Sequence, residues 1–222
     1  MTNLVLFGDS ITAGMTDGYP SPIFSNEIRK YFPNIEILNR GVPGDRTDLA
    51  LSRIQADVIQ SSPDIVTIFF GTNDITDEGP DYQTFISNIK EMVTLIGTQK
   101  CILITPGITG PNLQNFYPNQ KLSQYAQGLV TLAEELNVAC YDWHSVATEY
   151  EASELLQADD IHYSKKAYEL LVQGLAPLIE AKEVADQIWF MADGYVQEVG
   201  TPEEVFEHPT SERAKDFLAK IL

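Results

Sequence analysis

Short runs of apolar residues alternate along the chain with longer stretches in which apolar positions recur at helical spacing. The short runs are apolar almost throughout, which is typical of strands covered by helices on both faces. We expect strands at 4–8, 35–38, 64–71, 100–105 and 138–141. We expect helices at 21–31, 47–61, 81–97, 119–136 and 164–182. This alternation predicts an α/β fold in three layers, a five-stranded parallel sheet between two layers of helices.

Several of these elements carry boundary signals. Thr47 or Asp48 is expected to cap the second helix, and Ser164 is expected to cap the last long helix. Pro106 is expected to end the fourth strand. The boundaries therefore agree with the hydrophobic pattern.

The pattern changes after Lys182. An Asp-Gly pair at Asp193 favours a tight hairpin turn between two short apolar strings. The predicted elements are strands at 187–191 and 195–199, a helix that begins at Thr201 and a helix over 211–222. We therefore divide the chain into a main domain, residues 1–182, and a C-terminal appendage of a hairpin and helices, residues 183–222, called the tail below.

The charge and the apolar run lengths restrict the partners. The 222 residues include 32 acidic and 14 basic ones, a net charge of −18. Such a field repels nucleic acid and anionic lipid surfaces, so we expect no nucleic acid partner. No apolar run approaches the roughly 20 residues of a membrane-spanning helix.

The cysteines and the N-terminus predict a location. Cys101 and Cys140 show no CxxC spacing and are expected to be free thiols in a reducing compartment. The first ten residues have no basic leader. We therefore expect a cytoplasmic protein.

Polar residues follow several of the predicted strands. In a parallel sheet, ligands bind beyond the carboxyl ends of the strands, so these residues can converge on one edge. The segments are Gly8-Asp9-Ser10, 39–45, Gly71-Thr72-Asn73-Asp74 and, before the last long helix, Asp159-Asp160-Ile161-His162.

These segments hold the parts of a serine hydrolase. A serine hydroxyl such as that of Ser10 becomes a nucleophile when an imidazole, here His162, accepts its proton. Asp159 lies three residues before His162 and can orient the ring. The backbone NH groups of Ser10 and Gly44 and the amide of Asn73 can form an oxyanion hole.

Each residue alone also has a purely structural explanation. Ser10 and Asp159 could cap helices, Gly44 could serve a turn, and Asn73 could form a local Asx turn. Together, in this order and after strand ends, they favour catalysis.

Other polar residues give weaker signals. His144 is expected to be partly exposed and without a function. Asp9, Asp45 and Asp74 could suggest a metal site, but turn bonding accounts for an Asp at such positions. We predict no metal and no cofactor.

The quoted motifs point to a family. Phe7-Gly8-Asp9-Ser10-Ile11-Thr12, 39–44, 71–74 and Asp159-x-x-His162 resemble the four blocks of the SGNH hydrolases, also called GDSL esterases or lipases, over residues 1–182. The resemblance implies a flavodoxin-like strand order, 2-1-3-4-5. It also implies a catalytic triad of Ser10, Asp159 and His162, and an oxyanion hole of Ser10, Gly44 and Asn73. The family includes carboxylesterases, thioesterases, lysophospholipases and carbohydrate deacetylases.

The tail resembles a different family. Its sequence is similar to the C-terminal end of ATP-binding subunits of polar amino acid ABC transporters. The chain contains no GxxxxGK[ST] loop to cradle a triphosphate, so nucleotide hydrolysis does not carry over. Because the tail is short and contains several large apolar side chains, we expect it to dock on the main domain or on a second subunit.

The sequence therefore predicts a serine esterase that hydrolyses small, short-chain carboxylic esters through an acyl-enzyme. The alternative is a non-catalytic binding or adaptor protein with this fold, whose tail contacts a transporter partner. A receiver domain lacks support because no acidic pair follows the first strand. A flavin-binding module lacks support because no Ser/Thr-rich phosphate loop follows that strand. The expected partners are the small ester and either a second copy of the chain or a partner bound by the tail.

Overall fold

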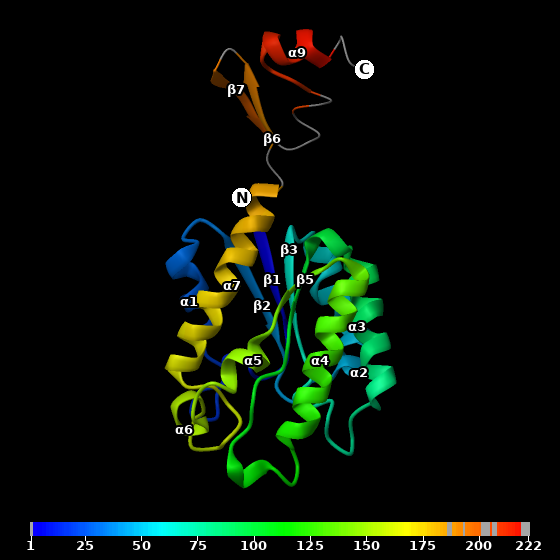
Figure 1. Ribbon diagram of the computed structural model, residues 1–222, viewed down its shortest axis with the longest axis vertical. Coiled ribbons are helices and arrows are strands. Elements are labelled where there is room, and N and C mark those ends of the chain that lie inside the picture. The colour runs from blue at the N-terminus through cyan, green and yellow to red at the C-terminus, as the bar shows by residue number, and fades with distance from the viewer. Residues whose placement is uncertain (1, 186–187, 193, 201–204, 206–207, 219–222) are drawn as a thin grey trace. The chain divides into compact units, whose positions relative to one another are not determined.

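The structure, a computed structural model, describes residues 2–185, 188–192, 194–200, 205 and 208–218 of the 222-residue chain. These residues form two compact units, 1–178 and 179–222 (Figure 1). The division falls within the long helix α7 (Lys165–Ala185). The domain boundary predicted at residue 182 stays a prediction.

Unit 1 is built on a parallel sheet. Its strands are β1 (Asn3–Gly8), β2 (Glu36–Gly41), β3 (Ile65–Phe69), β4 (Cys101–Ile104) and β5 (Ala139–Tyr141). They lie in the order β2-β1-β3-β4-β5, and every neighbouring pair is parallel. Val5 in β1 is paired with Leu38 on one side and with Val66 on the other. The predicted fold class and strand order are confirmed.

Helices cover both faces of this sheet. Besides α7 they are α1 (Ile23–Tyr31), α2 (Thr47–Asp57), α3 (Tyr82–Ile96), α4 (Asn119–Leu136), α5 (Trp143–Ala147) and α6 (Ala152–Leu155), with short 3-10 turns at Ile59–Ser61, Thr98–Lys100 and Pro111–Leu113. Figure 1 shows α1 and α7 on one side of the sheet and α2, α3 and α4 on the other. No helix in the described part of the chain is both long and apolar enough to cross a membrane.

The alternation of strand side chains divides the core between the two faces. Val5 and Phe7 of β1 belong to a buried cluster that includes Ile54 of α2, Ile89 of α3 and Leu129 of α4. Side chains at alternate positions of a strand point to opposite faces. Leu4 and Leu6, at the alternate positions of β1, are also fully buried, so this strand is covered on both faces, which explains why it is apolar almost throughout.

The N-terminus of α2 differs from the sequence prediction. Thr47 is the first helical residue rather than the cap, and Arg46 before it makes no side-chain capping bond. Instead, the Asp74 carboxylate accepts hydrogen bonds from the Thr47 NH (2.8 Å) and hydroxyl (2.5 Å). A carboxylate from a distant loop thus satisfies one of the free NH groups of this helix. The Ser164 hydroxyl does cap α7, accepting from the Ala167 NH at 3.3 Å.

Unit 2 contains the predicted hairpin and a short terminal helix. Strands β6 (Ile188–Ala192) and β7 (Tyr195–Gly200) are antiparallel, with an irregularity between Phe190 and Met191. The Phe190 ring contacts Phe217 of helix α9 (Glu212–Leu218) at 5.3 Å between centroids. The predicted helix start at Thr201 lies outside the described residues, and so do residues 219–222 of the predicted last helix.

Tyr168 connects α7 to the loop that follows β1. Its ring is fully buried beside Phe24 of α1, and its hydroxyl donates to the Ile11 carbonyl at 2.7 Å. The Ile11 carbonyl also accepts from the Gly14 NH at 3.1 Å. Tyr168 therefore anchors the loop after β1 to the last helix of the unit.

We predict that Tyr168→Phe lowers the free energy of unfolding by about 1 kcal/mol, the typical net contribution of one such hydrogen bond. Equilibrium unfolding in urea measures this, with Tyr19→Phe as the control because Tyr19 is 76% exposed. Equal stability of the two variants would contradict the anchoring role.

Candidate active site

Ser10 lies in a tight turn directly after β1. Gly8 ends the strand where a Cβ atom would come within 2.1 Å of the Thr12 hydroxyl and 2.6 Å of the Phe69 carbonyl. The Asp9 carboxylate accepts from the Ile11 NH at 2.8 Å, and the Met15 NH donates to the Ser10 carbonyl at 3.1 Å. These contacts fix the backbone on both sides of Ser10, which is 7% exposed.

Asn73, after β3, joins the loops that follow β1 and β2. Its Nδ2 donates to the Asp45 backbone carbonyl at 2.9 Å and to Asp9 Oδ2 at 3.3 Å. Gly44 directly precedes Asp45, has a φ of +77° and has open space where a Cβ would lie. The side chain of Asn73 therefore bonds across segments and does not form the local Asx turn weighed above.

His162 and Asp159 form a hydrogen-bonded pair. His162 Nδ1 lies 2.7 Å from Asp159 Oδ2. Asp159 Oδ1 accepts from the backbone NH of His162 (3.0 Å) and of Ile161 (3.2 Å). Burial acts to raise the Asp159 pKa, but these bonds outweigh it and hold the pKa below its usual value. Asp159 is therefore ionised at neutral pH and fixes the ring through Nδ1.

Gln157 holds this pair next to the loop of Ser10. Its Nε2 donates to the carbonyls of Met15 (2.7 Å) and Tyr163 (2.8 Å), and its Oε1 accepts from the Asp17 NH at 3.1 Å. The sequence analysis did not predict these contacts of Gln157, because nothing in the sequence distinguishes this loop glutamine from a solvent-exposed one. Within the described residues, no hydrogen bond joins the Ser10 hydroxyl to His162, so this contact of the triad stays a prediction.

Buried carboxyl groups surround the turn of Ser10. Burial raises the pKa of Asp9 to about 7; the charges of Asp74 and Asp45 add to this, whereas the Ile11 NH opposes it. Burial also raises the pKa of Asp74 to about 6, against the hydrogen bonds from Thr47. Near pH 7 Asp9 is therefore only partly ionised, which reduces the negative charge beside the predicted oxyanion hole.

The structure changes the sequence-based expectations for two other residues. The Asp45 NH does donate within a turn, to the Val42 carbonyl at 3.1 Å, but its carboxylate also pairs with Arg53, whose Nε and Nη2 lie 2.8 and 2.6 Å from Oδ2. His144 was expected to be partly exposed, but it is buried, and its Nδ1 lies 2.9 Å from the Gly107 carbonyl. Among the described residues, no group of three or more His, Cys, Asp or Glu side chains is arranged to hold a metal ion.

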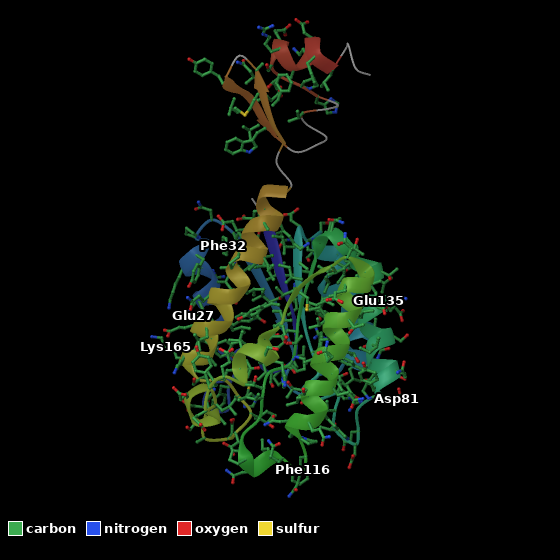
Figure 2. All side chains as sticks on the ribbon, viewed as in Figure 1. Glu27, Phe32, Asp81, Phe116, Glu135 and Lys165 are labelled. Carbon is green, nitrogen blue, oxygen red and sulfur yellow. The ribbon has the colours of Figure 1, made fainter. Side chains whose placement is uncertain are left out.

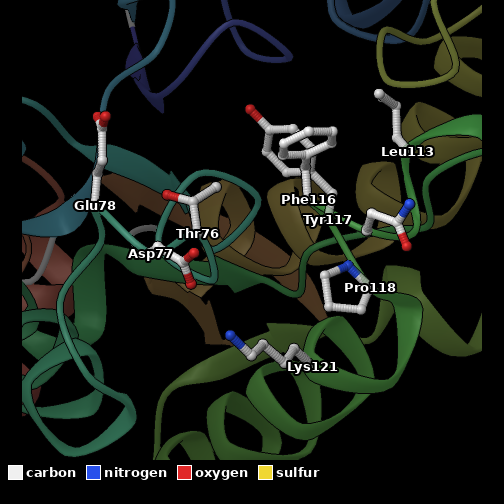
Figure 3. A pocket seen from close by; sticks show the side chains of 9 residues that line it. Thr76, Asp77, Glu78, Leu113, Phe116, Tyr117, Pro118 and Lys121 are labelled. Carbon is white, nitrogen blue, oxygen red and sulfur yellow. The ribbon is translucent and has the colours of Figure 1, made fainter.

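A cavity of about 480 Å³ lies between the loop after β3 and the loop after β4. Figure 3 shows Phe116 and Tyr117 across from Asp77 and Glu78, with Lys121 below them. The lining residues are Thr76, Asp77, Glu78, Leu113, Asn115, Phe116, Tyr117, Pro118 and Lys121.

Hydrogen bonds connect the residues around this cavity with the segment of Asn73 and with the segment of His162. The Thr76 hydroxyl donates to the Asn73 carbonyl at 2.8 Å. Next to the lining residue Leu113, the NH and side-chain amide of Asn112 donate to Asp160, two residues before His162, at 3.1 and 2.6 Å. The cavity therefore lies beside the predicted site and at the same edge of the sheet.

The tail matches a second group of proteins. Over 41 residues, 18% of this chain, it is 61% identical to the probable amino-acid import ATP-binding protein YxeO of Bacillus subtilis. The match spans only 16% of that protein. So short a match does not assign the transport activity of such proteins to this chain.

Unit 1 matches esterases. The isoamyl acetate-hydrolyzing esterase of Saccharomyces cerevisiae is 29% identical over 206 residues, covering 79% of this chain and 85% of that protein. A crystal structure of a lipase/acylhydrolase from Enterococcus faecalis superimposes with a TM-score of 0.78 at 33% identity, covering 82% of this chain and 97% of that one. The profile of the GDSL-like lipase/acylhydrolase family matches residues 6–170. With its sheet, its strand-end motifs and these relatives, the chain belongs to the GDSL-like lipase/acylhydrolase family of ester-hydrolysing enzymes.

Proposed function

We propose that this protein is a serine esterase that cleaves small carboxylic esters through an acyl-enzyme. The observation that carries the proposal is the pair of hydrogen bonds from Asn73 Nδ2 to Asp45 and Asp9, because it draws three strand-end loops together around Ser10. The 2.7 Å contact between His162 and Asp159 supports the proposed proton transfers to and from His162.

In the first step, Ser10 Oγ attacks the ester carbonyl carbon and gives its proton to His162 Nε2. Asp159 accepts from the Nδ1–H of the ring, which orients the imidazole and stabilises the imidazolium. The tetrahedral intermediate collapses when His162 protonates the leaving alcohol. Water then attacks the acyl-enzyme with His162 as base, releasing the acid and restoring Ser10.

The developing oxyanion needs donors that are not already in use. In the described chain, the backbone NH groups of Ser10 and Gly44 donate to no other group. One hydrogen of Asn73 Nδ2 is held by Asp45, and the other makes only the longer contact of 3.3 Å with Asp9. We assign this second hydrogen, which is held only by the weaker contact, to the oxyanion, and it completes a set of three donors.

The cavity and the charge support a small neutral ester as the substrate. The aromatic rings of Phe116 and Tyr117 offer an apolar wall for a short acyl or alcohol group. The net charge of −18 disfavours anionic phospholipid surfaces. The yeast relative, named for hydrolysis of isoamyl acetate, agrees with a small ester.

The tail favours one alternative. Its 61% identity to part of an ATP-binding transport protein would suit an adaptor that binds a transporter partner and has no turnover. Measured ester hydrolysis by the pure protein distinguishes the two functions. A second copy of the chain or a partner bound by the tail, and the cytoplasmic location, stay predictions from the sequence.

Ser10→Ala is expected to lower kcat for p-nitrophenyl acetate by about 10⁴-fold or more, because removal of the nucleophile leaves only binding and the oxyanion hole. Ser153→Ala, at an exposed position of α6, is the matched control and should retain the wild-type rate. A Ser10→Ala variant that turns over at the wild-type rate would rule out the proposed nucleophile.

Phe116→Ala is expected to change acyl-length preference. Phe116 is 69% exposed, and Figure 2 places it at the end of unit 1 where the strands have their carboxyl ends. Loss of its apolar surface should lower kcat/KM for an octanoyl ester by roughly tenfold, with little change for an acetyl ester. Tyr31→Ala, on α1, is the control. A uniform change along the ester series would contradict a role in binding the acyl chain.

Deletion of residues 183–222 is expected to leave kcat/KM for p-nitrophenyl acetate within about twofold of wild type, because every proposed catalytic residue precedes residue 178. Steady-state kinetics and circular dichroism of both chains provide the test. A folded, truncated chain without activity would show that the tail contributes to the site.

A further inference from the structure

Arg53 of α2 uses all five of its NH donors inside the protein. Its Nε and Nη2 donate to Asp45 Oδ2 at 2.8 and 2.6 Å, and Nη2 also donates to the Gly8 carbonyl at 3.1 Å. Its Nη1 donates to the Arg40 carbonyl at 3.0 Å and to Asp57 Oδ2 at 2.8 Å. A guanidinium group has five donors in one rigid plane, so none is left over for a substrate.

Two of the acceptors, Gly8 and Asp45, lie close in sequence to predicted oxyanion donors. Gly8 lies two residues before Ser10, and Arg40 lies near the end of β2. Asp45 directly follows Gly44, and its backbone carbonyl accepts from Asn73 Nδ2. One guanidinium group is therefore connected to all three predicted donors. It bonds the backbone two residues before Ser10 and the side chain of the residue that follows Gly44. It is connected to Asn73 through Asp45.

The surroundings hold the guanidinium group in place. Its carbon lies 4.5 Å from the centroid of the Phe7 ring, which is fully buried against Phe70. The Asp45 side chain is 4% exposed and that of Arg53 18% exposed, so their ion pair is only weakly screened by water. A planar cation stacked on a ring and bonded at five points has little freedom to tilt.

We propose that Arg53 is a positioning residue of this esterase, which sets the distance between the NH groups of Ser10 and Gly44 and the direction of the Asn73 amide. The proposal rests on the proposed function, since it concerns the same oxyanion hole. Arg53 does not touch the substrate. It acts by holding the donors in the arrangement that the tetrahedral intermediate needs, so that no reorganisation is required during the reaction.

A merely structural role makes a different prediction. A buried ion pair that only supports the fold would change the stability of the protein and leave kcat of the folded molecules intact. A positioning role changes kcat while KM stays nearly constant, because misplaced oxyanion donors weaken binding of the transition state more than binding of the ester.

The test compares full-length Arg53→Lys with wild type and with the control Arg29→Lys, a position on α1 whose guanidinium contacts Asn26 at 3.2 Å. Lysine keeps the charge but cannot span these acceptors in one plane. We expect Arg53→Lys to lower kcat for p-nitrophenyl acetate by about 10- to 100-fold with KM within about threefold of wild type. We expect Arg29→Lys to match wild type. Arg53→Lys with unchanged kcat, together with a lower unfolding midpoint, would overturn the proposal.

Chemical rescue gives an independent readout. Arg53→Ala should lower kcat by about 10²- to 10³-fold. Guanidinium ion, added far below denaturing concentrations, should raise the kcat of this variant by at least about tenfold. Sodium ion at the same ionic strength should restore nothing. A folded Arg53→Ala variant that guanidinium does not rescue contradicts the proposal, and if this variant does not fold, Arg53→Lys decides alone.

Wild type and Ser10→Ala are assayed alongside. If wild type shows no turnover, or Ser10→Ala equals it, the proposed function fails. If both behave as expected and Arg53→Lys is unaffected, only the positioning role of Arg53 fails.

Discussion

All five strands of the sheet run in the same direction, and this constraint brings the strand-end loops to one edge. Asn73 and Asp9 are 64 residues apart in sequence, yet the side chain of Asn73 contacts Asp9 and the backbone of Asp45. An antiparallel arrangement of the same strands would send alternate loops to opposite edges. The site therefore depends first on strand direction, and only then on the residues within the loops.

Polar groups buried at this edge hold the strand-end loops in a fixed arrangement. Asp9, Asp45 and Asp74 are each less than 5% exposed, and burial raises the pKa of all three. Arg53 is paired with Asp45, and the NH and hydroxyl groups of Thr47 satisfy Asp74. Unpaired, such groups would be strongly destabilising, so the loops have little freedom to rearrange. In the proposed mechanism, this rigidity keeps the predicted oxyanion hole in one arrangement.

The sequence predicted most of the fold because the strands are short, apolar and bounded by clear turn residues. It also predicted that the segments of Ser10, Gly44 and Asn73 would meet, because each follows a strand of the same sheet. It did not predict α5 and α6, which have only five and four residues and show too little periodicity. The contacts of Gln157 and Arg53, and the bond from Asp74 to Thr47, depend on tertiary packing. No local pattern in the sequence marks such contacts.

The most direct measurement of the central claim is the site of covalent labelling by a fluorophosphonate. Its phosphorus reacts with an activated serine hydroxyl, and the tetrahedral product places an oxygen where the oxyanion would lie. The account predicts one equivalent of label per chain, found by peptide mass spectrometry on Ser10, with esterase activity lost in proportion. Label on another residue, or activity that survives complete modification of Ser10, would contradict it.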